Sequence, residues 1–189
     1  MSREQWEITL QEQCALKKLP PNFIRAIIWR ESNWIPDAIS PCGAVGLMQL
    51  MLPTAQDLGM KVFPVKAPQF KLQDERLCPD RNLTAGIQYL SQMGKILCSG
   101  SLVYKKGSKL VFGALIKDSD LYFKSLLAAY NGGIGHCCKA IAAARKQSLP
   151  LNWPAIDAAL KIVDPAGYAE CSTYVSKIWA KYQQLEGKT

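Results

Sequence analysis

Apolar residues recur along most of the chain at the spacing of one helix face, three or four positions apart. Trp6, Leu10 and Cys14 form the first such stripe, and the last extends from Tyr168 to Tyr182. Prolines and glycines delimit the segments between them, because proline is favoured in a first helical turn and glycine after a last one. The pattern predicts helices over 6–14, 21–35, 53–59, 82–97, 123–132, 134–145, 154–163 and 168–182, with Asn82 as the N-terminal cap of the fourth.

One segment departs from the helical pattern. Between residues 98 and 120, the apolar runs SLVY and KLVFGALI flank the basic turn KKGSK. This arrangement predicts a small β-hairpin over 101–116 or a mobile loop. The predicted fold class is therefore all-α, with crossing helices and this insert. Because 189 residues can bury one sizeable core, we expect 1–189 to be a single domain; two small domains are the alternative.

The chain carries 23 basic and 15 acidic residues, a net charge of +8. Such an excess favours anionic partners such as nucleic acid, anionic lipid or a cell-wall polymer. Nucleic acid is not expected, because no basic run is interleaved with aromatic residues. No apolar run reaches the ~18 residues that suggest a transmembrane helix, and the polar N-terminus does not resemble a secretory signal. We also expect a monomer.

Seven cysteines are spread along the chain without a repeat. Because the count is odd, at least one thiol is expected to be free or to pair outside the chain, and most are expected to be buried and reduced. His136, Cys137 and Cys138 are consecutive, so on a helix they point in different directions, and no CxxC pair accompanies them. Neither a metal site nor a cofactor is predicted.

Glu31 is the candidate for chemistry, because it shares a helix face with Ile24, Ile27 and Ile28. Trp34 and Ile35 are expected one turn further on the same side. Partial burial and the negative end of the helix dipole both disfavour an ionised carboxylate, so the pKa of Glu31 is expected to be raised, as a general acid requires. The alternative is a helix-end glutamate that points into water.

A motif rich in small and polar residues begins at Glu31. Its members are Glu31, Ser32, Pro36, Ala38, Ser40, Gly43, Ala44, Gly46, Leu47, Met48, Gln49, Thr54 and Ala55. In the same spacing and without gaps, these residues resemble the Glu-Ser, Pro, Ala, Ser, Gly-Ala, Gly-Leu-Met-Gln and Thr-Ala motif of the lytic transglycosylase catalytic domain, the goose-lysozyme-like module that cleaves peptidoglycan.

Three further blocks agree in order. LPPNFIRAIIWRES resembles the helix that carries the catalytic glutamate, NLTAGIQYL resembles the Asn, Ala-Gly, Tyr-Leu helix, and LLAAYNGG resembles the Ala-Tyr-Asn-Gly block. Tyr174 and Val175 in the last helix give a weaker match. The resemblance spans 19–182. Two departures are Met51-Leu52-Pro53, where the family more often has proline directly after methionine, and Cys42, where small residues are usual.

The resemblance implies Glu31 as the catalytic residue. It implies substrate contacts from Ser40, Met48, Gln49, Tyr130, Asn131 and Tyr174. The Gln49 amide suits a sugar hydroxyl or acetamido group, and the Tyr130 hydroxyl suits a hydrogen bond to the catalytic carboxylate. Without the motif, the glycines would be interpreted as turns, Leu47 and Met48 as core and Tyr130 as packing.

The resemblance further implies the reaction. Glu31 alone protonates the β-1,4 bond between N-acetylmuramic acid and N-acetylglucosamine, then accepts a proton from the muramic C6 hydroxyl, which closes on C1 to give a 1,6-anhydro end. The partners are then peptidoglycan glycan strands, with a possible contact to the anionic wall or membrane surface. Hydrolysis by water and a non-catalytic wall-binding component of a phage or secretion apparatus are the alternatives. The site of action is expected to be the bacterial periplasm or cell wall, by an unknown export route.

Overall fold

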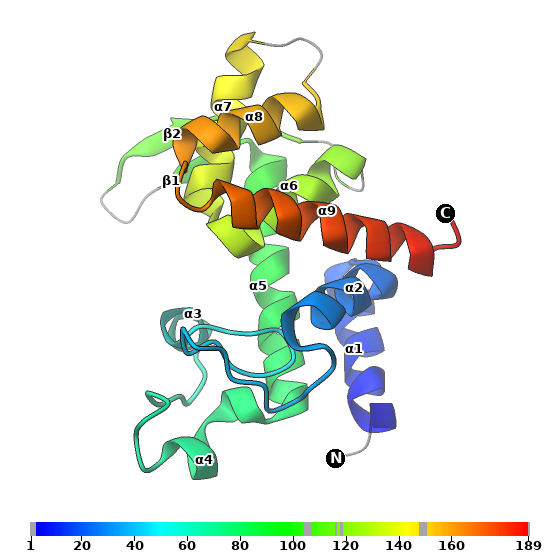
Figure 1. Ribbon diagram of the computed structural model, residues 1–189, viewed down its shortest axis with the longest axis vertical. Coiled ribbons are helices and arrows are strands. Elements are labelled where there is room, and N and C mark those ends of the chain that lie inside the picture. The colour runs from blue at the N-terminus through cyan, green and yellow to red at the C-terminus, as the bar shows by residue number, and fades with distance from the viewer. Residues whose placement is uncertain (1–2, 104–106, 116, 118, 148–150, 189) are drawn as a thin grey trace. The chain divides into compact units, whose positions relative to one another are not determined.

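The computed structural model describes residues 3–103, 107–115, 117, 119–147 and 151–188, and these are mostly helical (Figure 1). The chain forms two compact units, Met1–Ser91 with Lys181–Thr189, and Gln92–Ala180. Helices α5 (Pro79–Ser99) and α9 (Tyr168–Leu185) contribute to both. The single domain expected over 1–189 stays a prediction.

The first unit is built on α1 (Arg3–Lys17) and α2 (Pro21–Ser32), which pack against each other. Proline in the first turn starts α2, as the sequence predicted, and its inner face buries Phe23, Ile24 and Ile27 completely. The end of α9 closes the same core, where the Tyr182 ring meets Phe23 edge-on with centroids 5.5 Å apart.

Short elements follow α2 along the chain. They are α3 (Leu52–Asp57), which has proline in its first turn, α4 (Phe70–Gln73) and the 3₁₀-helix η1 (Glu75–Leu77). The start of α3 near Pro53 and a left-handed Gly59 just beyond its end confirm the predicted boundaries. Neither α4 nor η1 was predicted, because both are too short to show a helical period.

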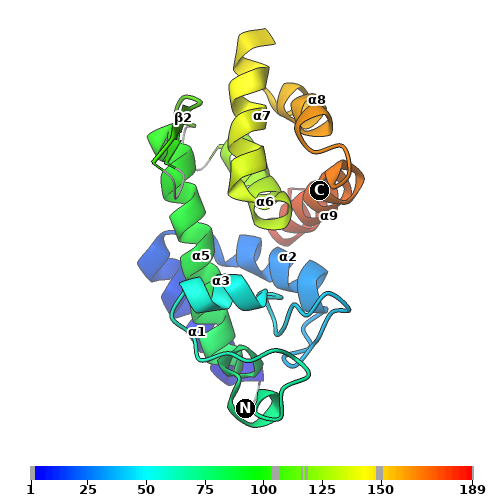
Figure 2. The same ribbon diagram turned by 90° about the vertical axis from the view of Figure 1, so that its left-hand side faces the viewer.

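The second unit holds α6 (Asp120–Gly132), α7 (Ile134–Gln147) and α8 (Trp153–Val163), with α7 packed against the other two (Figure 2). The side chains of Ser119 and Asn152 accept hydrogen bonds from backbone amides of the first turns of α6 and α8. Gly133, at φ 89°, ends α6 as predicted.

The predicted hairpin within 101–116 is confirmed. Strands β1 (Ser101–Val103) and β2 (Lys109–Val111) pair antiparallel with Leu102 opposite Leu110, and both strands contact α7. Residues 105 and 106 of the predicted basic turn lie outside the described residues.

Two local predictions are wrong. Asn82 does not cap a helix, because α5 begins at Pro79 and Asn82 is fully buried inside it. Trp34 and Ile35 do not continue the Glu31 face, because α2 ends at Ser32. Asn33 and Trp34 then adopt φ of 48° and 67°, and Ile35 is 51% exposed. The Trp34 ring instead packs 5.6 Å from that of Trp6.

No disulfide joins the seven cysteines, all of which lie among the described residues. Burial raises the pKa of Cys14 and of Cys138 to about 12 and that of Cys171 to about 11. These three thiols therefore stay protonated and behave as small apolar side chains. Cys42 is exposed on the surface of the first unit, whereas the other six cysteines are buried or partly buried.

Among the helices described, none combines the length and the apolar character needed to cross a membrane.

Candidate functional site

Glu31 lies in the last turn of α2 and is partly buried. Its neighbour Ser32 is buried, and the Ser32 hydroxyl lies 2.9 Å from the carbonyl oxygen of Leu47 and 3.3 Å from that of Ile28. One hydroxyl proton can be donated to only one acceptor at a time, and the shorter distance favours Leu47. Ser32 thereby joins the end of the Glu31 helix to the segment that carries Met48 and Gln49.

The segment from Ile39 to Leu50 folds back on itself through isolated bridges, which pair Val45 with Ile39 and with Leu50. Ser40 makes a tight turn within it. The Ser40 Oγ accepts a hydrogen bond from the backbone N–H of Ala44 at 3.0 Å, and the Ser40 carbonyl accepts one from Gly43. Since Oγ acts as an acceptor here, its own O–H remains a possible donor to a ligand.

Gly46 is required by its surroundings. It has φ 85°, and a Cβ at this position would lie 2.1 Å from Asn82 Nδ2 and 2.4 Å from the Arg76 carbonyl oxygen. A side chain would therefore collide with the buried groups that hold the segment, in addition to straining the backbone. The close approach that requires glycine at this position is to Asn82 and Arg76.

Asn82 fastens this segment to α5 through both ends of its amide group. Its Oδ1 accepts a hydrogen bond from the Met48 backbone N–H at 2.8 Å. Its Nδ2 donates to the carbonyls of Val45 at 2.9 Å and Arg76 at 3.0 Å. Asn82, the Asn of the family motif, is thus a buried brace. Its three hydrogen bonds hold the backbone of the 39–50 segment in place on both sides of Leu47.

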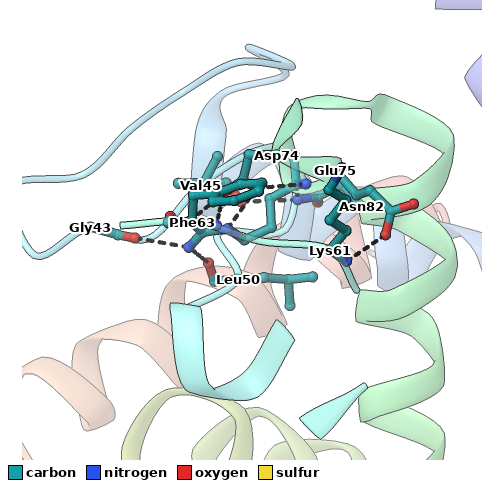
Figure 3. Close-up of polar contacts among 9 residues, drawn as sticks. Gly43, Val45, Leu50, Lys61, Phe63, Asp74, Glu75 and Asn82 are labelled. Carbon is teal, nitrogen blue, oxygen red and sulfur yellow. Dashed lines mark hydrogen bonds and ion pairs between the residues drawn. The ribbon is translucent and has the colours of Figure 1, made fainter. Parts of the chain in front are cut away.

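Arg76 provides a second brace from η1, with no exposed surface. Its guanidinium donates to the carbonyls of Gly43 and Leu50, both at 3.3 Å, and of Phe63 at 2.9 Å. Figure 3 shows these three residues gathered around the network together with Asp74. Because Gly43 lies within the 39–50 segment and Leu50 is its last residue, Arg76 holds the segment at two points.

Asp74 balances the charge of this buried arginine. Its two carboxylate oxygens accept hydrogen bonds from Arg76 Nε and the terminal nitrogen Nη2 at 3.0 and 2.9 Å, in the two-pronged geometry that suits this pair. Burial by itself raises the pKa of Asp74. The hydrogen bond and charge of Arg76, with backbone N–H donors from Phe63 and Arg76, outweigh burial and hold the pKa below its usual value.

Gln49 has left-handed backbone geometry, φ 46°, at the far end of the turn. Its Nε2 donates to the carbonyls of Ala38 at 3.1 Å and Gly46 at 2.9 Å. Both hydrogen bonds use the amide nitrogen. Toward a ligand, Gln49 therefore offers its amide oxygen as an acceptor, which is half of the donor-and-acceptor role expected from the sequence.

Met48 was predicted to contact substrate, but its side chain is fully buried in the first unit. It packs on Gly86 so closely that a Cβ there would lie 2.3 Å from the Met48 sulfur. The Ala-Gly step of the α5 motif thus makes room for Met48. The structure places this side chain in the core, as the alternative interpretation had it.

The other predicted site residues belong to the second unit. Tyr130 and Asn131 lie in the last turn of α6 and are partly buried, and Asn131 Nδ2 donates to Glu170 Oε1 at 3.4 Å. Tyr174, on α9, is 3% exposed, so its ring is a packing surface. An approach of Tyr130 to Glu31 stays a prediction, because the two residues belong to different units.

His136 faces an acid rather than the neighbouring thiols. Its Nδ1 lies 3.2 Å from Asp164 Oδ2, while the Cys137 thiol is buried and donates to the Ser125 carbonyl at 3.2 Å. Over the described part of the chain, no three His, Cys, Asp or Glu side chains gather where they could share a metal ion.

Sequence reasoning missed Arg76 and Asp74. The pattern Asp-x-Arg does predict a local ion pair, but the three carbonyl partners of Arg76 are 13 to 33 positions away. The sequence contains one signal that Arg76 is buried, the apolar residues within FKLQDERL. This stretch is too short for its apolar pattern to predict which side chains are buried. Ser32 was noted only as part of the motif.

Comparison with known proteins identifies the architecture. The model of the transglycosylase SLT domain family matches residues 9–150, so Tyr174 lies outside the match although the predicted span was 19–182. The lytic transglycosylase Slt of Pseudomonas aeruginosa superposes with a TM-score of 0.60 at 23% identity, over 96% of this chain and 24% of that one. The 70 kDa soluble lytic transglycosylase of Escherichia coli gives 0.57 over 95% and 24%, also at 23% identity. At this identity the likeness shows the fold, and it confirms the predicted all-α, lysozyme-like class.

Curated relatives agree with the family. The chain is 31% identical over 173 residues to a membrane-bound lytic murein transglycosylase F of Klebsiella pneumoniae and 29% identical over 177 residues to that of Vibrio vulnificus. These alignments cover 85% and 87% of this chain, which spans 28% of the length of either relative. The chain belongs to the transglycosylase SLT domain family.

Proposed function

We propose that the protein cleaves peptidoglycan as a lytic transglycosylase, with Glu31 as its single acid and base. One observation carries this proposal. Glu31 lies in the last turn of α2, and the Ser32 hydroxyl joins the end of this helix to the Leu47 carbonyl, in the segment that presents Ser40 and Gln49. The helix that carries the Glu31 carboxyl is thus joined to the segment of Ser40 and Gln49, in a family whose relatives are named lytic murein transglycosylases.

The reaction needs one residue in two successive roles. Protonated Glu31 gives its proton to the β-1,4 glycosidic oxygen, and the bond to muramic C1 breaks as the N-acetylglucosamine end leaves with its new hydroxyl. The substrate's own 2-acetamido oxygen stabilises the cationic C1. Ionised Glu31 then takes the proton from the C6 hydroxyl as that oxygen bonds to C1, so no water is consumed and Glu31 ends protonated.

The described contacts suggest how the neighbours take part. The amide oxygen of Gln49 accepts a hydrogen bond from a sugar N–H or O–H, and the Ser40 O–H donates one. Tyr130 and Asn131 are proposed to reach the substrate from the second unit, with the Tyr130 hydroxyl directed to the Glu31 carboxylate. Met48 and Tyr174 shape the site by packing.

Peptidoglycan strands are the proposed partner, and the bacterial periplasm or cell wall is the proposed place of action. The relatives are described as membrane-bound murein transglycosylases, and a net charge of +8 draws the chain to anionic wall and membrane surfaces. This attraction weakens as ionic strength rises.

Mass analysis of digested peptidoglycan tests the proposal. The unaltered protein should release muropeptides with 1,6-anhydro ends, one water lighter than hydrolytic products. Glu31→Gln should lower the rate by about 10²–10⁴-fold, because the amide cannot transfer the proton, while Asp37→Asn, an exposed neighbour, should leave it unchanged. Products heavier by one water would establish hydrolysis instead. Unchanged cleavage by Glu31→Gln, or none by the unaltered protein, would contradict the catalytic role.

A further inference from the structure

A pocket of about 310 Å³ opens in the first unit beside the Ser40 turn. Its walls come from residues 41–43, 51–52 and 64–66, and Arg76 lines it as well. The first wall starts one residue after Ser40, and the second starts two residues after Gln49. The pocket is therefore lined partly by the 39–50 segment itself and partly by the residues that directly follow it.

The lining does not suit a sugar ring. Pro41, Met51, Leu52, Pro64 and Val65 supply mostly hydrocarbon surface, and the two prolines have no backbone N–H to offer. A sugar carries several hydroxyls, each of which loses a hydrogen bond to water when it enters such a space. The volume is at the lower end of the range for small-molecule sites, about 300–1,000 Å³, and fits methyl-bearing groups of one or two amino acids.

The charge at the pocket is positive. Lys66 lies on the wall and is exposed, and among the described residues no protein group accepts a hydrogen bond from its ammonium. Arg76 is already balanced by Asp74. No acidic side chain appears in the described lining. A ligand that combines small apolar groups with a carboxylate therefore complements both the walls and the charge.

We propose that this pocket binds the peptide stem of peptidoglycan, the short acidic peptide carried by each muramic acid. An alanine methyl of the stem enters between Met51, Leu52 and Val65, and a stem carboxylate pairs with Lys66. This inference rests on the proposed function, since it assigns to the same substrate a second contact outside the glycan. It makes Lys66 a specificity-determining residue that takes no part in bond cleavage.

The first test compares two substrates, glycan strands with their stems and the same strands stripped of stems by an amidase. Lys66→Glu should raise KM for stem-bearing strands about tenfold with kcat little changed, because a like charge now faces the stem carboxylate. Stripped strands should be cleaved as by the unaltered protein. The matched control is Lys71→Glu, which makes the same charge change at an exposed position on α4, outside the pocket.

The second test measures binding without activity. A synthetic stem tetrapeptide is titrated into the isotopically labelled full chain, and NMR shifts are expected at Cys42, Leu52, Val65 and Lys66 and not at Lys71. Equal losses on both substrates, or no shifts at saturating peptide, would overturn the stem subsite. A protein that cleaves neither substrate would refute the proposed function, and the titration would still decide whether the pocket takes the peptide.

Discussion

Two antiparallel turns, the 39–50 segment of the first unit and the β1–β2 hairpin of the second, are held by different forces. Backbone carbonyls in the 39–50 segment are bound by the buried side chains of Asn82 and Arg76, which come from elsewhere in the chain. The hairpin pairs its own strands and buries Leu102, while Val103 and Val111 face outward, 64% and 68% exposed. A shape set by buried polar side chains can be lost through one distant substitution, whereas a shape set by strand pairing tolerates changes on its outer face.

The largest expected effect comes from removing the arginine of the network. Arg76→Met retains a long, unbranched side chain. It leaves the Asp74 carboxylate and three backbone carbonyl groups without their buried hydrogen-bond donor. We expect the free energy of unfolding to fall by about 3–5 kcal/mol, measured by urea denaturation. Arg81→Met, at a side chain 69% exposed, is the control and should change stability by less than about 0.5 kcal/mol. Similar values for the two variants would refute the bracing role of Arg76.

A smaller effect is expected from acid. Because the folded-state pKa of Asp74 lies below its ordinary value, the native state binds this proton less readily than the unfolded chain. Its stabilisation is complete above the unfolded pKa, about 3.9, and is lost as pH falls through the lower folded value. Urea denaturation from pH 7 to pH 2.5 should show stability falling below about pH 4.

The variant Asp74→Asn distinguishes the contribution of the Asp74 carboxylate to acid sensitivity from that of the other carboxylates. The variant should be less stable at neutral pH, since it leaves Arg76 charged and buried without an ionic partner, and its stability should fall less steeply in acid. Asp37→Asn, at an exposed position, should retain the steep fall. A pH profile for Asp74→Asn parallel to that of the unaltered protein would show that another group controls the acid response.

The smallest effect is expected on the outer face of the hairpin. Val111→Thr retains a β-branched side chain at an exposed strand position, so stability should change by less than about 0.5 kcal/mol. Thermal denaturation followed by circular dichroism measures this directly. A loss above about 1 kcal/mol would mean that this face is packed in solution, and the contrast with the 39–50 segment would fail.

The sequence predicted those features that depend on neighbouring residues. Pro21 starts α2, Gly133 ends α6, and the two apolar runs around 101–116 pair as a hairpin. Glu31 was selected from an apolar helix face and a long motif that both include it, and its catalytic role stays a prediction. These signals are local, so periodicity and turn chemistry were sufficient.

Features that depend on distant partners escaped prediction. Asn82 looks like a helix cap in sequence, yet its Oδ1 binds the Met48 amide 34 positions away. The left-handed Trp34 could not be anticipated, because a bulky residue rarely adopts that geometry and its ring is held by Trp6. Gln49 was expected to offer both a donor and an acceptor to a ligand, but whether its nitrogen is already used depends on where the Ala38 carbonyl lies.

At Gly43 and Leu50, Arg76 donates to backbone carbonyl oxygens, so these hydrogen bonds do not depend on which side chains the segment carries. The neighbouring surface positions Pro41 and Cys42 can therefore be exchanged without redirecting the main chain, provided that Arg76 remains. Substitutions at these two exposed positions would then alter the surface of the turn while its backbone keeps the same path.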